Sequence, residues 1–263
     1  LNTHHLAAQL EASLRAAAPS DVSLSFVHEP EILGTGGGVR NAWQPVEGET
    51  FLIMNGKYVF APDIAGALRA HRESGAIATM IVTPTRAGDP LGQIEIDPDK
   101  RVRRISGRGP AQPDEALTIH IYTGISLLHP RAHRDLPERG CLIRDAYWHW
   151  LARGERVLAW VDTADFRDVG RSHWHYWEAN QALLTGATRW PGIEPDRDGN
   201  LFASDVTLAE GARVRGSVLG LGAELAPGAR LERCVVWAGA RVSGEHQNAI
   251  VLPDGRVVPA GTG

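Results

Sequence analysis

The segment GTGGG at 34–38 is the part of the sequence best suited to binding a ligand. It lies between a predicted strand over 23–29 and a predicted helix that runs through Val39 to Trp43. Backbone N–H groups at such a junction, together with a helix N-terminus, can bind a nucleotide. The segment is neither a dinucleotide fingerprint, because Val39 stands where that pattern needs glycine, nor a P-loop, which needs Gly-Lys-Ser/Thr. A tight strand-to-helix turn that uses glycine for positive φ explains the same residues equally well.

Two further candidate positions also follow predicted strands. The apolar run 51–55 predicts a strand buried on both faces, and Lys57 comes shortly after its end. Ligands of open α/β sheets bind at the carboxyl ends of strands, although a simple strand-end turn is an equal alternative. Asp168 precedes Gly170 at a predicted strand-to-helix junction, where a helix cap or a loop carboxylate is the commoner role.

Other chemistries have weaker support. His173 and His175 have the spacing of a metal pair, but no third ligand stands nearby, so we expect partly exposed helix residues. With only Cys141 and Cys234, the chain has neither a disulfide framework nor a multi-cysteine zinc site. No Ser/His/Asp or Cys/His arrangement for nucleophilic catalysis stands out.

The elements that must position these residues alternate between strands and helices from about 21 to 185, which predicts an α/β fold with a mostly parallel, mixed sheet. The opening residues, 1–17, predict an amphipathic helix. Beyond the segments named above, we predict strands over 77–84 and 118–130, a hairpin over 93–106, and helices over 62–75, 143–154 and 173–186.

A different pattern follows the linker that is rich in Pro, Gly and Asp. VTLAEGARVRGSVLGLG is followed by AELAPGARLERCVVWAG, so that Leu208 corresponds to Leu225, 17 residues later. Within each unit an aliphatic residue recurs about every six residues, which is typical of a parallel β-helix with three faces. An ordinary antiparallel sheet is the weaker alternative. Such coils are usually structural or oligomerising.

Composition excludes several classes of protein. The chain has 263 residues, is 43% hydrophobic and carries a formal net charge of −4, so it is long and apolar enough to fold. It has no apolar run of membrane-spanning length and no signal peptide, and we therefore expect no membrane contact and a cytoplasmic location. The acidic balance argues against a nucleic-acid partner.

Taken together, five segments in order resemble the sugar-1-phosphate nucleotidyltransferase family, most closely its mannose-1-phosphate guanylyltransferase branch. The segments are LNTHHLAAQL, LGTGGGVRNA, FLIMNGK, YTGISLLHP and FRDVGRSHWHYWEAN. The resemblance implies a Rossmann-like α/β domain of the nucleotide-diphospho-sugar transferase type over 1–187, a linker over 188–200 and a short left-handed β-helix over 201–263. It also implies transfer of a nucleotidyl group from an NTP to a sugar 1-phosphate, with release of pyrophosphate.

The family's site residues carry over by position. Glu29 falls where the family reads the base edge, and a carboxylate suits the N1–H and N2–H₂ donors of guanine, which favours GTP. The resemblance implies a magnesium ligand at Asp168. The remaining implied residues are Gly34, Thr35, Gly36 and Gly37 for the nucleotide, and Asn55, Gly92, Thr123 and Gly124 for the sugar.

The sequence departs from the family in two places. Lys57 stands where the family has a second magnesium-binding Asp; an ammonium cannot coordinate Mg²⁺, although it can contact a phosphate. The family's first strand and its G-x-G-T-R phosphate loop have no counterpart, and we expect them upstream of Leu1 in the native protein or missing in a degenerate relative.

The leading hypothesis is synthesis of GDP-mannose with Mg²⁺ as cofactor, in a homo-oligomer assembled through the β-helix. A glucose-1-phosphate uridylyl- or thymidylyltransferase and a non-catalytic regulatory subunit that binds a nucleotide sugar are the alternatives. An acyltransferase is disfavoured, because the coil is short and has no catalytic histidine within its clear turns.

Overall fold

The computed structural model describes residues 1–43, 49–85, 93–112, 115–190 and 192–261. The chain forms two units with separate internal contacts. The first unit comprises 1–55 and 62–163, and the second comprises 56–61 and 164–263.

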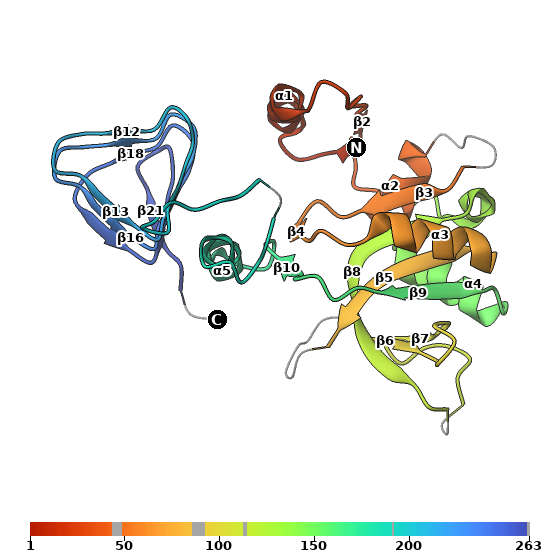
Figure 1. Ribbon diagram of the computed structural model, residues 1–263. Helices are drawn as coiled ribbons and strands as arrows, with labels where there is room; N and C mark the ends of the chain where they lie inside the picture. The colour runs from red at the N-terminus through yellow and green to blue at the C-terminus, as the bar shows by residue number, and fades with distance from the viewer. Residues whose placement is uncertain (44–48, 86–92, 113–114, 191, 262–263) are drawn as a thin grey trace. The chain divides into compact units, whose positions relative to one another are not determined.

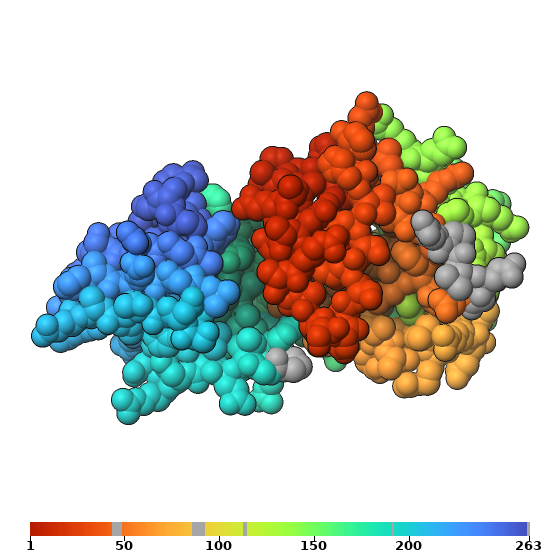
Figure 2. Space-filling view, turned by 90° about the horizontal axis from the view of Figure 1, so that it is seen from above, coloured from red at the N-terminus to blue at the C-terminus, as the bar shows by residue number. Residues whose placement is uncertain are grey.

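The N-terminal segment of the first unit is a short strand followed by an exposed helix. β1 (Asn2–Thr3) pairs in parallel with β2 (Val27–His28). Helix α1 (Ala7–Ala17) then has no buried residue, and Figure 2 shows this part of the chain, in red, on the molecular surface. The prediction of one helix over 1–17 is therefore corrected. Its first residues are extended because their backbone hydrogen bonds go to the segment that ends at Glu29.

A six-stranded sheet forms the centre of the first unit (Figure 1). Its long strand β8 pairs with β5 along one edge, while β6 and β3 share the other edge. Among the described strands of this sheet, only the pairing of β5 with β9 is parallel. The sheet is mixed, as predicted, but the expectation that it is mostly parallel is corrected, because β8 runs antiparallel to each of its three neighbours. The strands are β3 (Phe51–Met54), β5 (Ala78–Pro84), β6 (Gln93–Ile96), β7 (Val102–Ile105), β8 (Thr118–Leu128) and β9 (Val157–Val161).

The prediction for residues 51–55 holds for the strand but not for its burial. Ile53 is buried in β3, whereas Leu52 and Met54 are 41% and 55% exposed. The strand has β8 as its pairing partner, and one of its faces is left uncovered by the described residues. The predicted hairpin over 93–106 is confirmed as the antiparallel pair β6–β7.

Helices cover both faces of this sheet. On one face, α3 (Ile64–Ser74) packs through buried His71, whose Nδ1 lies 2.8 Å from Oγ1 of Thr79 in β5. On the other face, buried Tyr147 and Trp150 join the hydrophobic core. They belong to a π-helical turn, η2 (Ile143–Tyr147), that continues into α4 (Trp148–Ala152).

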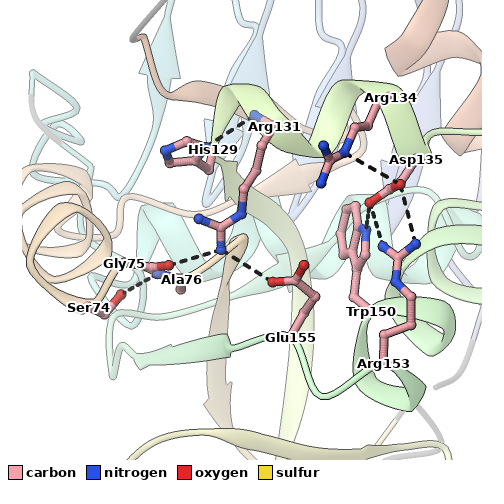
Figure 3. A network of polar contacts seen from close by, with 10 residues as sticks. All are labelled: Ser74, Gly75, Ala76, His129, Arg131, Arg134, Asp135, Trp150, Arg153 and Glu155. Carbon is pink, nitrogen blue, oxygen red and sulfur yellow. Dashed lines mark hydrogen bonds and ion pairs between the residues drawn. The ribbon is translucent and has the colours of Figure 1, made fainter.

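Arginine side chains join the segments that follow β8 to neighbouring loops, as Figure 3 shows. Arg131, in the 3₁₀ helix η1 (Pro130–Asp135), donates to the carbonyl of Gly75 at 3.0 Å and to Glu155 at 3.4 Å. Asp135 accepts hydrogen bonds from the buried indole of Trp150 at 3.0 Å and from Arg153 at 2.6 Å. These contacts satisfy polar groups at the edge of the core.

The second unit contains a three-sided coil of short strands (Figure 1). One side is the sheet β11-β14-β17-β20-β21, and the others are β12-β15-β18 and β13-β16-β19. All pairings are parallel except that of β20 with β21. The strands are β11 (Leu201–Phe202), β12 (Thr207–Leu208), β13 (Arg213–Arg215), β14 (Val218–Leu219), β15 (Glu224–Leu225), β16 (Arg230–Glu232), β17 (Val235–Val236), β18 (Arg241–Val242), β19 (Glu245–Gln247), β20 (Ala249–Val251) and β21 (Val257–Pro259).

The register of the coil agrees with the repeat in the sequence. Leu208 pairs with Leu225, and Leu225 pairs with Val242. Leu225 and Val242 are buried, but Leu208 is 46% exposed because it lies in the first strand of its side. The third side is less regular, since His246 pairs with Leu231 at an aliphatic position. The left-handed sense of the coil stays a prediction.

Helix α5 (His173–Leu184) belongs by its contacts to the second unit, whereas the sequence places it before the predicted boundary at 187. Trp177 explains the difference. Its ring packs with Val235, Ile250 and Ala260 of the coil segment, and its Nε1 donates to the carbonyl of Arg233 at 2.6 Å. The contact units thus divide after Thr163, and the domain boundary after residue 187 stays a prediction.

No helix among the described residues is long and apolar enough to cross a membrane.

Candidate functional site

The glycine segment is itself the start of a helix. Helix α2 (Gly34–Ala42) contains all four glycines, and only Gly34 has a positive φ, of 77°. The predicted glycine turn with a helix beginning near Val39 is therefore corrected. Glycine is a poor helix former, so tertiary contacts must account for helical structure here.

Those contacts come from the loop before η2. The amides of Gly36 and Gly37 both donate to the carbonyl of Gly140, at 2.8 and 3.4 Å. A Cβ on Gly36 would lie 2.7 Å from the ring of Pro137, and one on Gly37 would lie 2.6 Å from the carbonyl oxygen of Glu138. Close packing thus requires glycine at both positions. The hydrogen bonds to Gly140 also occupy the backbone N–H groups of Gly36 and Gly37, which the sequence predicts to bind a nucleotide.

Thr35 and Gly34 take part in the same contact. Oγ1 of Thr35 accepts a hydrogen bond from the amide of Leu142 at 2.9 Å. A Cβ on Gly34 would lie 2.5 Å from the oxygen of Gly140. Gly140 is the residue that sequence reasoning missed: Pro137 and Gly140 indicate a tight loop, but no spacing connects that loop to the glycine segment.

Glu29 is a buried carboxylate, 4% exposed, at the end of the segment that contains β2. Its Oε1 accepts from the side chain of Asn2 at 3.1 Å, and its Oε2 accepts from the amide of Leu33 at 3.1 Å. The structure therefore gives this residue a connecting role between the N-terminal segment and the start of α2. Its predicted role in recognising guanine stays a prediction.

Asn55, Thr123 and Gly124, which the resemblance assigns to the sugar, meet at an irregularity of the sheet. The register between β5 and β8 shifts after Ile81, so that Thr123 and Gly124 form a bulge. Gly124 has φ of 76°, and its carbonyl accepts the amide of Asn55 at 3.1 Å. Bulges of this kind often lie beside functional sites, because they direct side chains out of the regular pleat. Gly92, also assigned to the sugar, lies outside the described residues.

Lys57 and Asp168 form an ion pair in the second unit. The strands β4 (Tyr58–Val59) and β10 (Arg167–Asp168) pair in antiparallel fashion, with Tyr58 opposite Asp168. The amide of Val169 also donates to the carbonyl of Lys57 at 3.0 Å. This backbone ladder places Nζ of Lys57 3.2 Å from Oδ2 of Asp168.

The two members of this pair differ in exposure. The Asp168 side chain is 3% exposed and that of Lys57 is 51% exposed. Oδ1 of Asp168 accepts the amide of Gly170 at 3.0 Å, so both carboxylate oxygens have partners. Partial burial lowers the pKa of Lys57, but the hydrogen bond to Asp168 and nearby negative groups outweigh it and raise the pKa above its ordinary value. Lys57 is therefore a stable ammonium at neutral pH.

This pair does not fit the two-carboxylate magnesium site that the resemblance implies. Asp168 is a single carboxylate whose charge is already balanced by Lys57. Across the described ranges, no group of three or more His, Cys, Asp or Glu side chains is arranged to hold a metal ion. His173 and His175 lie in the first turn of α5, where Nδ1 of His175 is 2.8 Å from Oγ of Ser172. They are exposed or half-buried helix residues, as expected.

The chain also matches known proteins. Residues 1–186 match the family model described as Nucleotidyl transferase. A mannose-1-phosphate guanylyltransferase of Mycobacterium tuberculosis is 27% identical over 92% of this chain and 67% of its own length. A UTP–glucose-1-phosphate uridylyltransferase of Synechocystis is 26% identical over 74% of this chain and 54% of its own length. The chain thus spans about two thirds of the first relative and about half of the second.

Solved structures share the fold. The crystal structure of HddC from Yersinia pseudotuberculosis has a TM-score of 0.55 at 23% identity, covering 68% of this chain and 75% of that one. HddC complexed with GMP-PN has a TM-score of 0.53 at 22% identity, covering 66% and 73%.

Proposed function

The chain belongs to the nucleotidyl transferase family, a family of enzymes, and on that premise we propose that it makes a nucleotide-diphospho-sugar from an NTP and a sugar 1-phosphate. The proposed substrates are GTP and mannose 1-phosphate, with pyrophosphate as the second product. The similarity to the mannose-1-phosphate guanylyltransferase over 92% of this chain carries this choice. GTP specificity, a requirement for magnesium in turnover, a cytoplasmic location and assembly through the coil belong to the same proposal.

Two alternatives each have an observation in their favour. Similarity to the uridylyltransferase over 74% of the chain supports UTP and glucose 1-phosphate. The Lys57–Asp168 pair supports a non-catalytic subunit that binds a nucleotide sugar, because it occupies the place of the implied metal site.

One assay separates the three. The natively expressed protein, after its intact mass has been measured, is supplied with GTP or UTP together with mannose 1-phosphate or glucose 1-phosphate, and pyrophosphate release is followed. We expect the highest kcat/KM with GTP and mannose 1-phosphate, and no release when the sugar 1-phosphate is omitted. A preference for UTP and glucose 1-phosphate would replace the proposal with the first alternative. Binding of GDP-mannose without any turnover would replace it with the second.

Glu29 provides a test of base selection. Glu29→Gln keeps the size of the side chain but offers an amide where guanine needs an acceptor. If Glu29 contacts the base, the preference for GTP over UTP should fall. If Glu29 serves only to connect Asn2 with Leu33, the variant should lose thermal stability with its base preference unchanged.

A further inference from the structure

Lys57 is held in one place by contacts on several sides. Its backbone is paired with the segment that carries Asp168, and Nζ lies 5.1 Å from the centre of the Tyr58 ring. Gly170 lies against the aliphatic stem: a Cβ there would be 3.0 Å from Cδ and 3.1 Å from Cβ of Lys57. The side chain is therefore positioned before any ligand arrives, which reduces the entropy lost on binding.

The charges of this site are already matched without a metal ion. The buried carboxylate of Asp168 needs one positive charge, and Lys57 supplies it at 3.2 Å. A divalent cation at Asp168 would have to displace the ammonium, and it would gain only one carboxylate ligand in return.

The ammonium remains open to a ligand. Lysine carries three donors, and about half of the Lys57 side chain is exposed while Asp168 lies behind it, buried. An ammonium with one face against a buried carboxylate and another toward solvent is suited to a phosphoryl oxygen, which it binds through a charge-assisted hydrogen bond.

We propose that Lys57 is the fixed cation of this site and binds a phosphoryl group of the ligand without a divalent ion, while Asp168 positions the ammonium. This proposal rests on the proposed function for the identity of the ligand. It assigns to Lys57 the role that the resemblance gives to a metal. Binding of a nucleotide sugar is then independent of magnesium, whatever magnesium does in turnover.

Calorimetry with GDP-mannose tests this, in buffer with EDTA and in buffer with excess MgCl₂. We expect the same Kd in both buffers for the unaltered protein. Lys57→Met should weaken binding about tenfold in both, which is the loss of one charged hydrogen bond. Lys57→Asp should bind weakly in EDTA and recover with MgCl₂, because it creates a carboxylate pair. Loss of binding by the unaltered protein in EDTA would overturn the proposal, as would unchanged binding by Lys57→Met.

A second measurement is independent of the choice of nucleotide sugar. Lys57 and Lys100 are the only lysines among residues 1–263, so ¹³C reductive methylation labels two lysine side chains in this part of the protein. We expect inorganic pyrophosphate, in EDTA, to shift the Lys57 signal and leave that of exposed Lys100 in place. Lys57→Met identifies the signal, and Lys100→Met is the matched control.

The two measurements distinguish the two proposals. If GDP-mannose fails to bind but pyrophosphate shifts the Lys57 signal, the proposed substrate is wrong and the phosphate site stands. If GDP-mannose binds equally well to Lys57→Met, the phosphate site is wrong and the proposed substrate stands. If pyrophosphate moves neither lysine signal, Lys57 does not bind phosphate.

Discussion

The backbone amide of Gly36 donates a 2.8 Å hydrogen bond to the carbonyl of Gly140, and this contact brings the loop before η2 directly onto the first turn of α2. The glycines of α2 therefore serve close packing, whatever they contribute to a ligand. This explanation of the glycines can be tested separately from function.

Gly36→Ala should destabilise the first unit. The new Cβ would lie 2.7 Å from the Pro137 ring and 3.1 Å from the amide of Leu142, so the loop must move. We expect the free energy of unfolding to fall by about 1–3 kcal/mol in urea denaturation. Gly56→Ala is the control, because a Cβ there meets nothing within 4 Å. Equal stability of the two variants would refute the packing explanation.

His71 should make stability depend on pH. Burial lowers its pKa to about 4, with further contributions from the positive charges of His129, Arg131 and Arg72. The unfolded chain takes up this proton near pH 6.5, so between pH 6.5 and 4 the unfolded state binds more protons than the folded state. Stability should fall by up to about 3 kcal/mol as the pH falls through this window, and this contribution is constant above it.

Denaturation of the protein at a series of pH values measures this slope. His71→Asn should remove most of it, whereas exposed His149→Asn should leave it unchanged. A His71→Asn variant with the full slope would assign the effect to other groups.

Asp135 should matter far more than its neighbour Arg134. Asp135→Ala leaves the buried indole N–H of Trp150 without its acceptor, at a cost of about 1–3 kcal/mol. Arg134 is 72% exposed and lies 4.0 Å from Asp135, so Arg134→Ala should cost less than about 0.5 kcal/mol. Thermal denaturation of the two variants side by side checks this, and similar losses would contradict it.

Asn200 should stabilise the first turn of the coil. It is 3% exposed, its Oδ1 accepts the amide of Ser217 at 3.0 Å, and its Nδ2 donates to the carbonyl of Val214 at 3.2 Å. Asn200→Ala leaves a buried amide unsatisfied and should cost about 2 kcal/mol.

Hydrogen exchange provides a local measurement of the same change. The Ser217 amide should exchange faster in Asn200→Ala, and at its normal rate in the control Asp198→Ala, whose side chain is exposed. Unchanged protection at Ser217 in Asn200→Ala would show that the side chain is dispensable.

The sequence predicts those parts of the fold that repeat or alternate. The 17-residue repeat gives the coil register, as Leu208 opposite Leu225 confirms. Strand direction is different: β8 runs antiparallel to its neighbours because of how the chain connects them, and no local pattern encodes this. The contact of Gly36 with Gly140 joins segments that are remote in sequence, and it likewise has no periodic signal.

The sequence predicts the site as separate residues rather than as a set. Lys57 and Asp168 were each identified from their positions after strands, but their pairing depends on two strands of two residues each. Such strands are too short for alternation to show. In the sequence, only the opposite charges of Lys57 and Asp168 indicate that these two side chains could form an ion pair.

The bulge in β8 contains two residues rather than one. This number determines toward which face of the sheet the side chains after the bulge point. Tyr122 on one side of it and Ser126 on the other still point to the same face, where their hydroxyl oxygens are 2.7 Å apart. Deleting Gly124 alone would turn half of the strand over and exchange its core and outer side chains. Deleting Thr123 and Gly124 together would keep the parity of the strand, so tolerance to deletions here should alternate between odd and even lengths.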